Sequence, residues 1–454
     1  MSVNITFLGG TGTVTGSKYL VRSGTQSLLV DCGLFQGYKM LRLRNWTPLP
    51  VAPDQVDAVL LTHAHLDHSG YLPLLAREGF TGPIYATTGT RDLCRILLPD
   101  SGHIQEEDAE FANRHAFSKH APALPLYTRQ NALDCLPLFK ARDFGVRFDP
   151  LPGWHATFSP AGHILGAASL LLEVAGRRIL FSGDLGRPDD LIMNPPAAAP
   201  AADTVLIEST YGDREHPQEN VLAELGPALK RLVQRKGVAV IPVFAVGRAQ
   251  ALLHAIQLLK LRGELPKSLP VFLDSPMAVH TTHLFEHHLG EHRLTAKEAQ
   301  ALTRTATMVS STDDSRALAQ RRGTMVILSA SGMATGGRVL HHLERYAGEA
   351  RNMILLTGFQ APGTRGATLA SGASSVRIHG HDVALRAEVV QLQSASAHAD
   401  ASQLLAWLRS MPKAPEQVYV VHGELGPSDE LRKRVQHELG WRTRVPEHGA
   451  TWPV

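Results

Sequence analysis

The sequence predicts an α/β fold with more than one compact unit, and three observations support this. The chain has 454 residues, too many for one ordinary core and close to what about three units of ~150 residues would need. Short β-branched segments separated by glycine turns open the chain, whereas strand and helix patterns alternate between 218 and 346. With 44% hydrophobic and 19% charged residues, the composition is that of a folded globular protein.

The N-terminal part of the chain predicts two sets of short strands. An antiparallel meander is expected over 4–31, and a buried strand over 56–62 runs directly into a polar cluster that precedes a helix. A second set of strands is expected over 154–182, and a further strand ends at Glu208. Polar residues therefore follow the ends of several predicted strands.

From 218 onward the pattern becomes a regular alternation. Helices are expected at 218–234, 248–261, 277–289 and 335–346, with strands at 238–243, 271–273 and 325–329. Such alternation predicts a parallel sheet covered by helices, and therefore a separate α/β domain. Short strands return from 352, with helices at 401–410 and 428–439.

Charge, cysteine content and hydropathy narrow the functional classes. The net charge of +3 and the three cysteines indicate neither a strongly basic nucleic-acid binder nor a disulfide scaffold. No apolar run approaches the ~18 residues of a membrane span, and the first residues lack the basic flank of an export signal. We therefore expect a cytoplasmic protein. The 23 histidines are the unusual feature, because imidazole is the commonest metal ligand.

Four potential metal ligands lie within six residues directly after the strand predicted at 56–62. They are His63, His65, Asp67 and His68. Alternate residues of an extended chain point the same way, so the first two imidazoles can converge on one ion while the next two residues reach a neighbouring one. Three more candidates also follow apolar strands: His163, Asp184 and His422. Two ions ~3.5–4 Å apart would need a bridging carboxylate and such distant imidazoles.

These residues resemble the motifs of a known family. His63-x-His65-x-Asp67-His68, His163 and Asp184, with Asp31 upstream, resemble the successive motifs of the metallo-β-lactamase superfamily. Three later segments resemble the extra motifs of its β-CASP branch, which contains RNA-processing and DNA-repair nucleases: Glu208-Ser209-Thr210-Tyr211-Gly212, Ser396-Ala397-His398-Ala399-Asp400 and Val421-His422-Gly423-Glu424. The resemblance implies a four-layer αββα sandwich over 1–208 and 352–454, with a β-CASP α/β domain inserted at 209–351.

The resemblance also implies a role for each of these residues. One zinc ion (Zn2+) would be held by His63, His65 and His163, the other by Asp67, His68 and His422, with Asp184 bridging the two. Asp31 would orient a ligand imidazole, and a turn cap before Gly33 stays open as its alternative role. Histidine and carboxylate ligands suit two zinc ions per chain, while Mn2+ or Fe would be tolerated.

A phosphodiester is the substrate expected for such a centre. Two ions that share a water lower the pKa of that water and hold hydroxide in line with phosphorus. His398 is the candidate proton donor to the leaving alkoxide, oriented and kept protonated by Glu208. The predicted catalytic set is therefore His398, Glu208, Asp67 and Asp184. The alternative for the first two is a helix cap near 401 and a surface salt bridge.

Substrate contacts are expected in the inserted domain. Ser329, Ser331, Gly332 and Met333 lie between a predicted strand and a helix that begins near 335, where backbone N–H groups can bind phosphate. This segment resembles a family RNA-contact loop. Arg248, at another strand-to-helix turn, is a further candidate, and so are Thr364 and Arg365 in the segment Gly363-Thr364-Arg365-Gly366.

We therefore expect a two-zinc ribonuclease that cleaves single-stranded RNA, with an endonucleolytic mode favoured. Three alternatives stay open: a DNA nuclease of the same branch, a small-ester or thioester hydrolase of the superfamily, and a catalytically inactive RNA-binding subunit. No membrane partner is expected, and a homodimer is one open alternative for the assembly.

Overall fold

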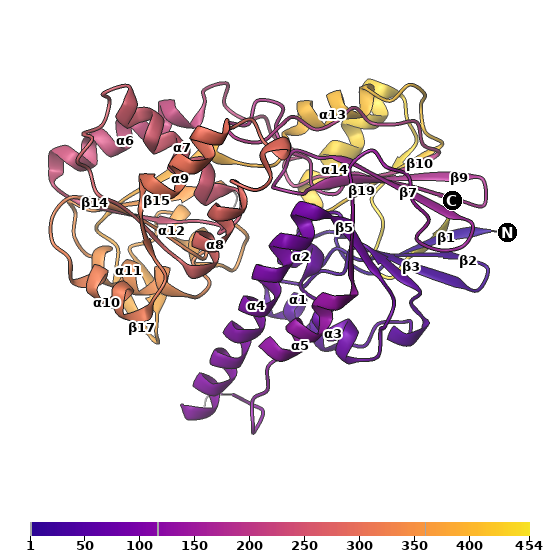
Figure 1. The fold of residues 1–454 in the computed structure, drawn as a ribbon, viewed down its shortest axis with the longest axis horizontal. Helices are drawn as coiled ribbons and strands as arrows, with labels where there is room; N and C mark the ends of the chain where they lie inside the picture. Colours follow the sequence, from indigo (N-terminus) through magenta and orange to yellow (C-terminus); the bar gives the residue numbers. More distant parts are fainter. Residues whose placement is uncertain (1, 116–117, 359) are drawn as a thin grey trace. The chain divides into compact units, whose positions relative to one another are not determined.

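The computed structural model describes residues 2–115, 118–358 and 360–454, which form two compact units (Figure 1). The first unit contains the residues up to 189 together with 194–215 and 398–454. The second unit contains 190–193 and 216–397. The chain therefore leaves the first unit after 215 and returns to it at 398.

Two sheets pack face to face in the first unit. The strands of one sheet are, in spatial order, β21 (Thr451–Pro453), β1 (Val3–Phe7), β2 (Tyr19–Ser23), β3 (Gln26–Val30), β4 (Ala58–Leu60), β5 (Ile84–Thr87) and β6 (Phe139–Arg142). Those of the other are β20 (Thr443–Arg444), β19 (Gln417–Val421), β10 (Thr204–Glu208), β9 (Arg177–Phe181), β8 (Ala168–Val174) and β7 (Trp154–Pro160). Buried side chains from both sheets, such as Ile5 and Phe158, share one hydrophobic cluster. The predicted antiparallel meander is confirmed in β1, β2 and β3.

Helices cover the outer faces of both sheets of this unit (Figure 1). On the first sheet lie α2 (Leu66–Ser69), α3 (Leu72–Arg77), α4 (Thr88–Arg114) and α5 (Arg129–Cys135), and α1 (Lys39–Leu43) precedes them in the chain. On the second sheet lie α13 (Ala401–Arg409) and α14 (Leu425–Arg434). These four layers confirm the αββα sandwich that the resemblance implied.

The second unit is built on a parallel sheet. Its strands are, in spatial order, β13 (Thr307–Val309), β12 (Val271–Asp274), β14 (Met325–Ser329), β11 (Val238–Pro242), β15 (Met353–Thr357) and β18 (Glu388–Leu392). One face packs against α6 (Val221–Arg235), α7 (Arg248–Leu261), α8 (Pro276–Leu284) and α9 (Ala296–Thr305). The other packs against α10 (Thr312–Gln320), α11 (Arg338–Tyr346), α12 (Arg365–Ala370) and a hairpin of β16 (Ser375–Ile378) and β17 (His381–Ala384).

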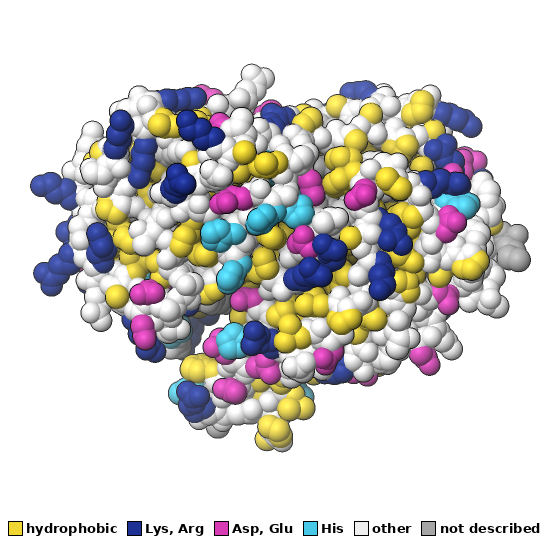
Figure 2. Space-filling view, viewed as in Figure 1, with side chains coloured by type: hydrophobic (Ala, Val, Ile, Leu, Met, Phe, Trp, Pro, Cys, Tyr) yellow, Lys and Arg dark blue, Asp and Glu magenta, His cyan; other side chains and the backbone are white. Residues whose placement is uncertain are grey.

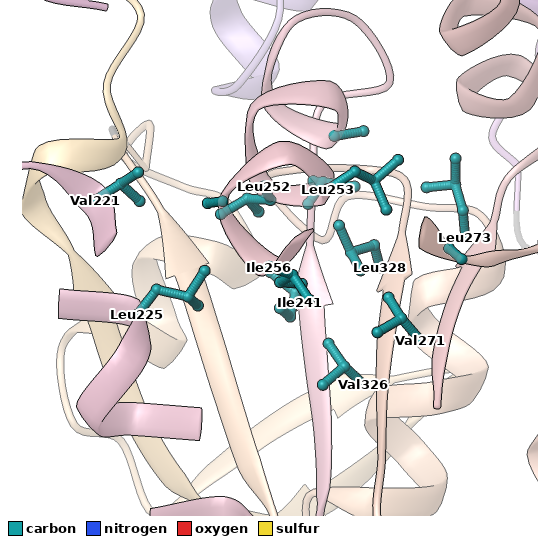
Figure 3. Packing of buried hydrophobic residues seen from close by; sticks show 14 of the residues in the cluster. Val221, Leu225, Ile241, Leu252, Leu253, Ile256, Val271, Leu273, Val326 and Leu328 are labelled. Atoms are coloured by element: carbon teal, nitrogen blue, oxygen red, sulfur yellow. The ribbon is translucent and has the colours of Figure 1, made fainter. Parts of the chain in front are cut away.

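Figure 3 shows why the alternating pattern folds in this way. Leu252, Leu253 and Ile256 of α7 lie against Ile241 of β11 and Leu328 of β14, and all five side chains are at most 2% exposed. Burying side chains of this size stabilises a fold by about 1.5–3 kcal/mol each. The predicted parallel sheet with covering helices is confirmed.

Several predicted limits differ from the structure. The helix expected at 335–346 begins at Arg338, because residues 331–337 form turns that end at Gly337 with φ +75°. The helix expected at 277–289 ends at Leu284. Residues 352–397 group with the second unit, since β15 pairs with β11 and β18. The predicted limits of the inserted domain, 209–351, stay a prediction.

Among the described residues no helix combines the length and the apolar character needed to cross a bilayer.

Candidate metal centre

The carboxyl ends of three strands in the first unit carry four of the predicted metal ligands. His63 and His65 follow β4, Asp184 follows β9, and His422 follows β19. The strands β9, β10 and β19 run parallel side by side, so their carboxyl ends meet at one edge of the sheet. Chain segments as far apart as residues 63 and 422 therefore supply side chains to one place.

A first group of four donors surrounds one point. It consists of His63, His65, His163 and Asp184, whose ligand atoms all lie within 4.8 Å of one another. His65 Nδ1 lies 3.2 Å from both His63 Nε2 and His163 Nε2. Asp184 Oδ2 lies 3.4 Å from His63 Nε2 and 3.6 Å from His163 Nε2.

A second group consists of Asp67, His68 and His422, and Asp184 lies against two of its members, His68 and His422. Asp67 Oδ2 lies 3.2 Å from His422 Nε2 and 3.9 Å from His68 Nε2. The other carboxylate oxygen of Asp184, Oδ1, lies 3.2 Å from His68 Nε2. One oxygen of Asp184 therefore faces each group, which is the arrangement of a bridging carboxylate.

These donors fit divalent transition-metal ions. Four ligands at about 2.0–2.1 Å from a tetrahedral ion stand about 3.3 Å apart. In the first group, His63 and His163 each lie 3.2–3.6 Å from His65 and from Asp184. His68 Nε2 and Asp184 Oδ1 are buried, and among the residues that the structure describes neither has a hydrogen bond of good geometry, although they lie 3.2 Å apart. Burying two polar atoms without hydrogen bonds destabilises a fold unless another partner, such as a metal ion, binds them.

The backbone also departs from its usual conformation at this place. Asp31 and His422 have φ values of +58° and +49°, in the left-handed region that residues other than glycine rarely adopt. Each follows the end of a strand, β3 and β19 respectively. Such conformations cost about 1–3 kcal/mol and persist where the surroundings demand them, typically at functional sites.

Neighbouring polar groups fix the orientation of the imidazoles. Asp31 Oδ2 lies 2.8 Å from His68 Nδ1 and also accepts a hydrogen bond from the Thr62 hydroxyl. The Thr210 hydroxyl lies 3.2 Å from His422 Nδ1. The roles of the two threonines were missed by the sequence analysis, and their only signal is the position of each beside a predicted site residue. Partners of this kind hold an imidazole in one tautomer and one orientation.

Burial and mutual charge control protonation in the centre. Burial lowers the pKa of His63 well below its ordinary value and that of His65 to about 4, so both imidazoles are neutral at pH 7. Burial alone would raise the pKa of Asp184, but the surrounding imidazoles, foremost His422 and His68, outweigh it and hold that pKa well below its usual range. Neutral imidazole and ionised carboxylate are the forms that bind a metal. Asp184 and Asp31 raise the pKa of His68 well above its ordinary value despite burial, so His68 must lose a proton when a metal binds.

A carboxylate–imidazole pair lies beside the first group. Glu208, at the end of β10, is fully buried, and its Oε1 and Oε2 atoms each lie 3.2 Å from His398 Nδ1. Because a carboxylate accepts hydrogen bonds, Nδ1 is the donor in this pair. Leu185 N–H donates a further hydrogen bond to Glu208 Oε1 at 2.7 Å. The His398 ring stands 4.4 Å from the His163 ring, and its side chain is 15% exposed.

The predicted phosphate-contact residues lie in the second unit, where several already have protein partners. Ser329 Oγ donates to the Asp274 carbonyl, and Ser331 Oγ lies 2.9 Å from Thr335 Oγ1. Thr364 caps α12, and the Arg365 guanidinium donates to the backbone carbonyls of Arg377 and Thr335.

The structure brings two of these predicted segments together, since Gly366 N–H donates to the Met333 carbonyl. Gly332 packs against the Phe244 ring, and Arg248 begins α7. On the face seen in Figure 2, Lys and Arg side chains are spread over the second unit instead of forming one stripe. Phosphate binding at these residues stays a prediction.

Three family models match consecutive parts of the chain. The metallo-β-lactamase superfamily model matches residues 11–220, the β-CASP domain model matches 249–369, and the model of the Zn-dependent metallo-hydrolase RNA specificity domain matches 382–446.

Curated relatives match nearly the whole chain. Ribonuclease TTHA0252 of Thermus thermophilus is 37% identical over 426 residues, which are 92% of this chain and 92% of that protein. Transcription termination factor FttA of Methanosarcina mazei is 30% identical, over 98% of this chain and 70% of its own length. A solved structure, a protein of unknown function from Enterococcus faecalis, aligns over all of both chains with a TM-score of 0.55 at 14% identity, a likeness of fold alone.

Proposed function

The chain belongs to the metallo-β-lactamase superfamily and to its β-CASP branch, and on this premise we propose that it is a two-zinc ribonuclease that cleaves single-stranded RNA endonucleolytically. The observation that carries the proposal is the position of Asp184, with one carboxylate oxygen on each of two donor groups. The RNA specificity domain model and the ribonuclease among the relatives support RNA as the substrate.

In this proposal seven side chains hold the two ions. His63, His65 and His163 would hold one zinc ion, Asp67, His68 and His422 would hold the other, and Asp184 would be shared between them. Two such ions, when bound, supply a nucleophile from water at neutral pH and neutralise the charge of the phosphate. Nitrogen and carboxylate donors favour zinc, although Mn2+ and Fe also accept such ligands.

His398 supplies the proton that the leaving alkoxide needs. Its Nδ1 is engaged by Glu208, so Nε2 is the nitrogen that can transfer a proton to a substrate oxygen. Glu208 is held in turn by the Leu185 N–H and by the Thr210 N–H, which lies 3.3 Å from Oε2. This fixed carboxylate keeps the imidazole in one orientation.

The role of His398 leads to a prediction that separates chemistry from metal binding. His398→Ala should bind as many zinc ions as wild type, with wild-type affinity, and lose about 10²–10⁴-fold in turnover, the usual contribution of a general acid. His103→Ala, which removes an exposed histidine on α4, is the matched control and should keep full turnover. Wild-type turnover in His398→Ala would remove this residue from the mechanism.

A substrate without ends tests the proposed activity. Zinc-loaded protein is incubated with circular single-stranded RNA, with circular single-stranded DNA and with a thioester. Linear RNA should appear while the DNA and the thioester stay intact, and Asp184→Ala should produce none. Cleavage of the DNA alone, hydrolysis of the thioester alone, no cleavage by protein whose metal centre holds both zinc ions, or cleavage that survives Asp184→Ala would each contradict the proposal.

A further inference from the structure

A second set of histidines lies in the second unit, on the outer side of helix α11 and the hairpin of β16 and β17. The inner sides of these elements are joined by a common core, in which Val339 and Leu343 of α11 lie in one cluster with Val376 and Ile378 of β16. All four of these side chains are at most 3% exposed. The helix and the hairpin are therefore held against each other by apolar packing before any polar contact is considered.

On these outer sides, potential metal-ligand side chains of the helix and of the hairpin lie close together. His341 and Glu344 are three residues apart on α11 and so share one face of the helix. His379 and His381 belong to the hairpin. His379 Nδ1 lies 3.0 Å from Glu344 Oε2, and His381 Nε2 lies 2.8 Å from Glu344 Oε1.

The imidazole of His341 lies beside Glu344 and His379. The rings of His341 and His379 are centred 4.6 Å apart, and the ligand atoms of His341, Glu344 and His379 all lie within 4.8 Å of one another. The separation of about 3.3 Å expected between ligands of a tetrahedral ion falls within this spread. Two imidazoles and one carboxylate are a ligand set used by zinc proteins.

The hairpin turn places His379 in a conformation that its side chain does not favour. His379 and Gly380 connect β16 to β17 with φ values of +47° and +88°. Two-residue turns with positive φ at both positions prefer Asn or Asp followed by Gly. A histidine in the left-handed conformation costs about 1–2 kcal/mol. Asn or Asp would form the same turn at a lower cost, so the turn by itself does not explain the histidine.

Ion pairing explains the cluster poorly at neutral pH. The side chains of His379 and Glu344 are each about one-third exposed, and pairs at that exposure contribute at most about 1 kcal/mol.

We propose that His341, Glu344 and His379 bind an additional divalent transition-metal ion, with Zn2+ as the expected occupant and His381 within reach as a further ligand. The ion would fasten the exposed side of α11 to the hairpin. Because α11 directly follows the turns at 331–337, the ion would also anchor the end of the segment that carries Ser331, Gly332 and Met333. This site uses none of the ligands of the metal centre in the first unit.

Counting bound metal tests the proposal in the full-length protein. Metal-stripped protein is titrated with Zn2+ in competition with a chromophoric chelator, and the same chain is titrated with Co2+ while its visible absorption is recorded. The double variant His341→Ala/His379→Ala should bind one equivalent fewer than wild type and lose one component of the Co2+ spectrum. His379→Ala alone should weaken that equivalent at least tenfold.

The controls separate this site from the proposed catalytic one. His283→Ala/His287→Ala removes two other exposed histidines of the second unit and should bind as many equivalents as wild type. Asp184→Ala should weaken binding at the catalytic centre and leave the additional equivalent unchanged. Equal stoichiometry in wild type and His341→Ala/His379→Ala would overturn the proposal, as would wild-type affinity for that equivalent in Glu344→Gln, which changes only the carboxylate.

Discussion

The substitution Gly33→Ala should displace part of the metal centre without replacing any of the proposed ligand residues. Gly33 lies two residues after Asp31 and packs against the backbone of the segment that carries Asp67 and His68. Cys32 N–H donates to the His68 carbonyl at 2.7 Å, and Leu34 N–H donates to the Leu66 carbonyl at 2.8 Å. These two hydrogen bonds hold the segments on either side of Gly33 in direct contact.

The clash follows from the measured distances. A methyl group on Gly33 would lie 1.6 Å from the Asp67 carbonyl oxygen and 2.6 Å from His68 N, whereas ordinary contact begins at 3.4 Å. The two segments must separate by about 1.8 Å, far beyond the ±0.2 Å tolerance of metal–ligand distances. Removal of a hydrogen-bond partner of a metal ligand lowers metal affinity about 10–100-fold. We expect zinc affinity to fall by at least this much in Gly33→Ala, because the ligand segment itself is displaced. Stability should fall by about 3 kcal/mol, the upper range for overpacking.

Chelator competition measures the zinc affinity, and urea unfolding measures the free energy of unfolding. Gly426→Ala is the control, because a methyl group there meets nothing within 4 Å and the residue lies in α14, close to His422 in the sequence. That variant should keep wild-type zinc affinity. Its free energy of unfolding should rise by about 0.5–1 kcal/mol, because alanine favours a helix more than glycine does. Wild-type zinc affinity and stability in Gly33→Ala would refute the reasoning.

Two further predictions concern the surroundings of the centre. Asp31→Asn keeps the shape but loses the charge that faces His68 Nδ1, so zinc affinity measured by chelator competition should fall about 10–100-fold; unchanged affinity would contradict this role. Lys18 is buried between Phe35 and Tyr71 and donates to the Gly33 carbonyl, and burial lowers its pKa to about 8. In the unfolded chain Lys18 keeps its proton up to about pH 10.5, whereas in the folded protein it loses this proton above about pH 8. The unfolded state therefore binds more protons in this range, and the free energy of unfolding should rise by about 3 kcal/mol between pH 8 and pH 10.5. Lys18→Met should abolish this rise in urea unfolding, and an identical rise in that variant would show that other groups cause it.

The sequence predicts those parts of the fold that rest on local pattern. The helix at Arg248–Leu261 and the strand at Met325–Ser329 have the predicted limits, because apolar periodicity and flanking turn residues agree there. Helix α9 and helix α10 were not predicted, since only Ala299 and Leu302 in the first and Leu318 in the second are buried. Short polar helices of this kind depend on caps, here Thr295 and Ser311, more than on an apolar stripe.

The candidate site divides in the same way. His63, His65, Asp67 and His68 stand out by spacing alone, whereas single residues such as His163 and His422 were linked to them by their position after apolar strands and by the family resemblance. Neither hydrophobic pattern nor spacing encodes that Thr62 contacts both Asp31 and His63, since these contacts depend on how strand ends meet in space. The cluster at His341, Glu344 and His379 was missed for the same reason, as its donors are separated in sequence and only the hairpin brings them together.

The pairing of β10 with β19 explains how a separate unit can interrupt the chain without disturbing the metal centre. The two strands run parallel, with Glu208 opposite Val421, so the residues that follow each strand emerge at the same point. Ser209 Oγ donates to the Val421 carbonyl, and Ser209 N–H donates to the His422 carbonyl at 3.2 Å. His422 N–H also donates to the Gly10 carbonyl at 2.6 Å. These contacts fix His422 and Glu208 from within the first unit. Because the cost of closing a loop grows only slowly with its length, the intervening residues can fold as a unit of their own while the strand pair keeps the ligands in register.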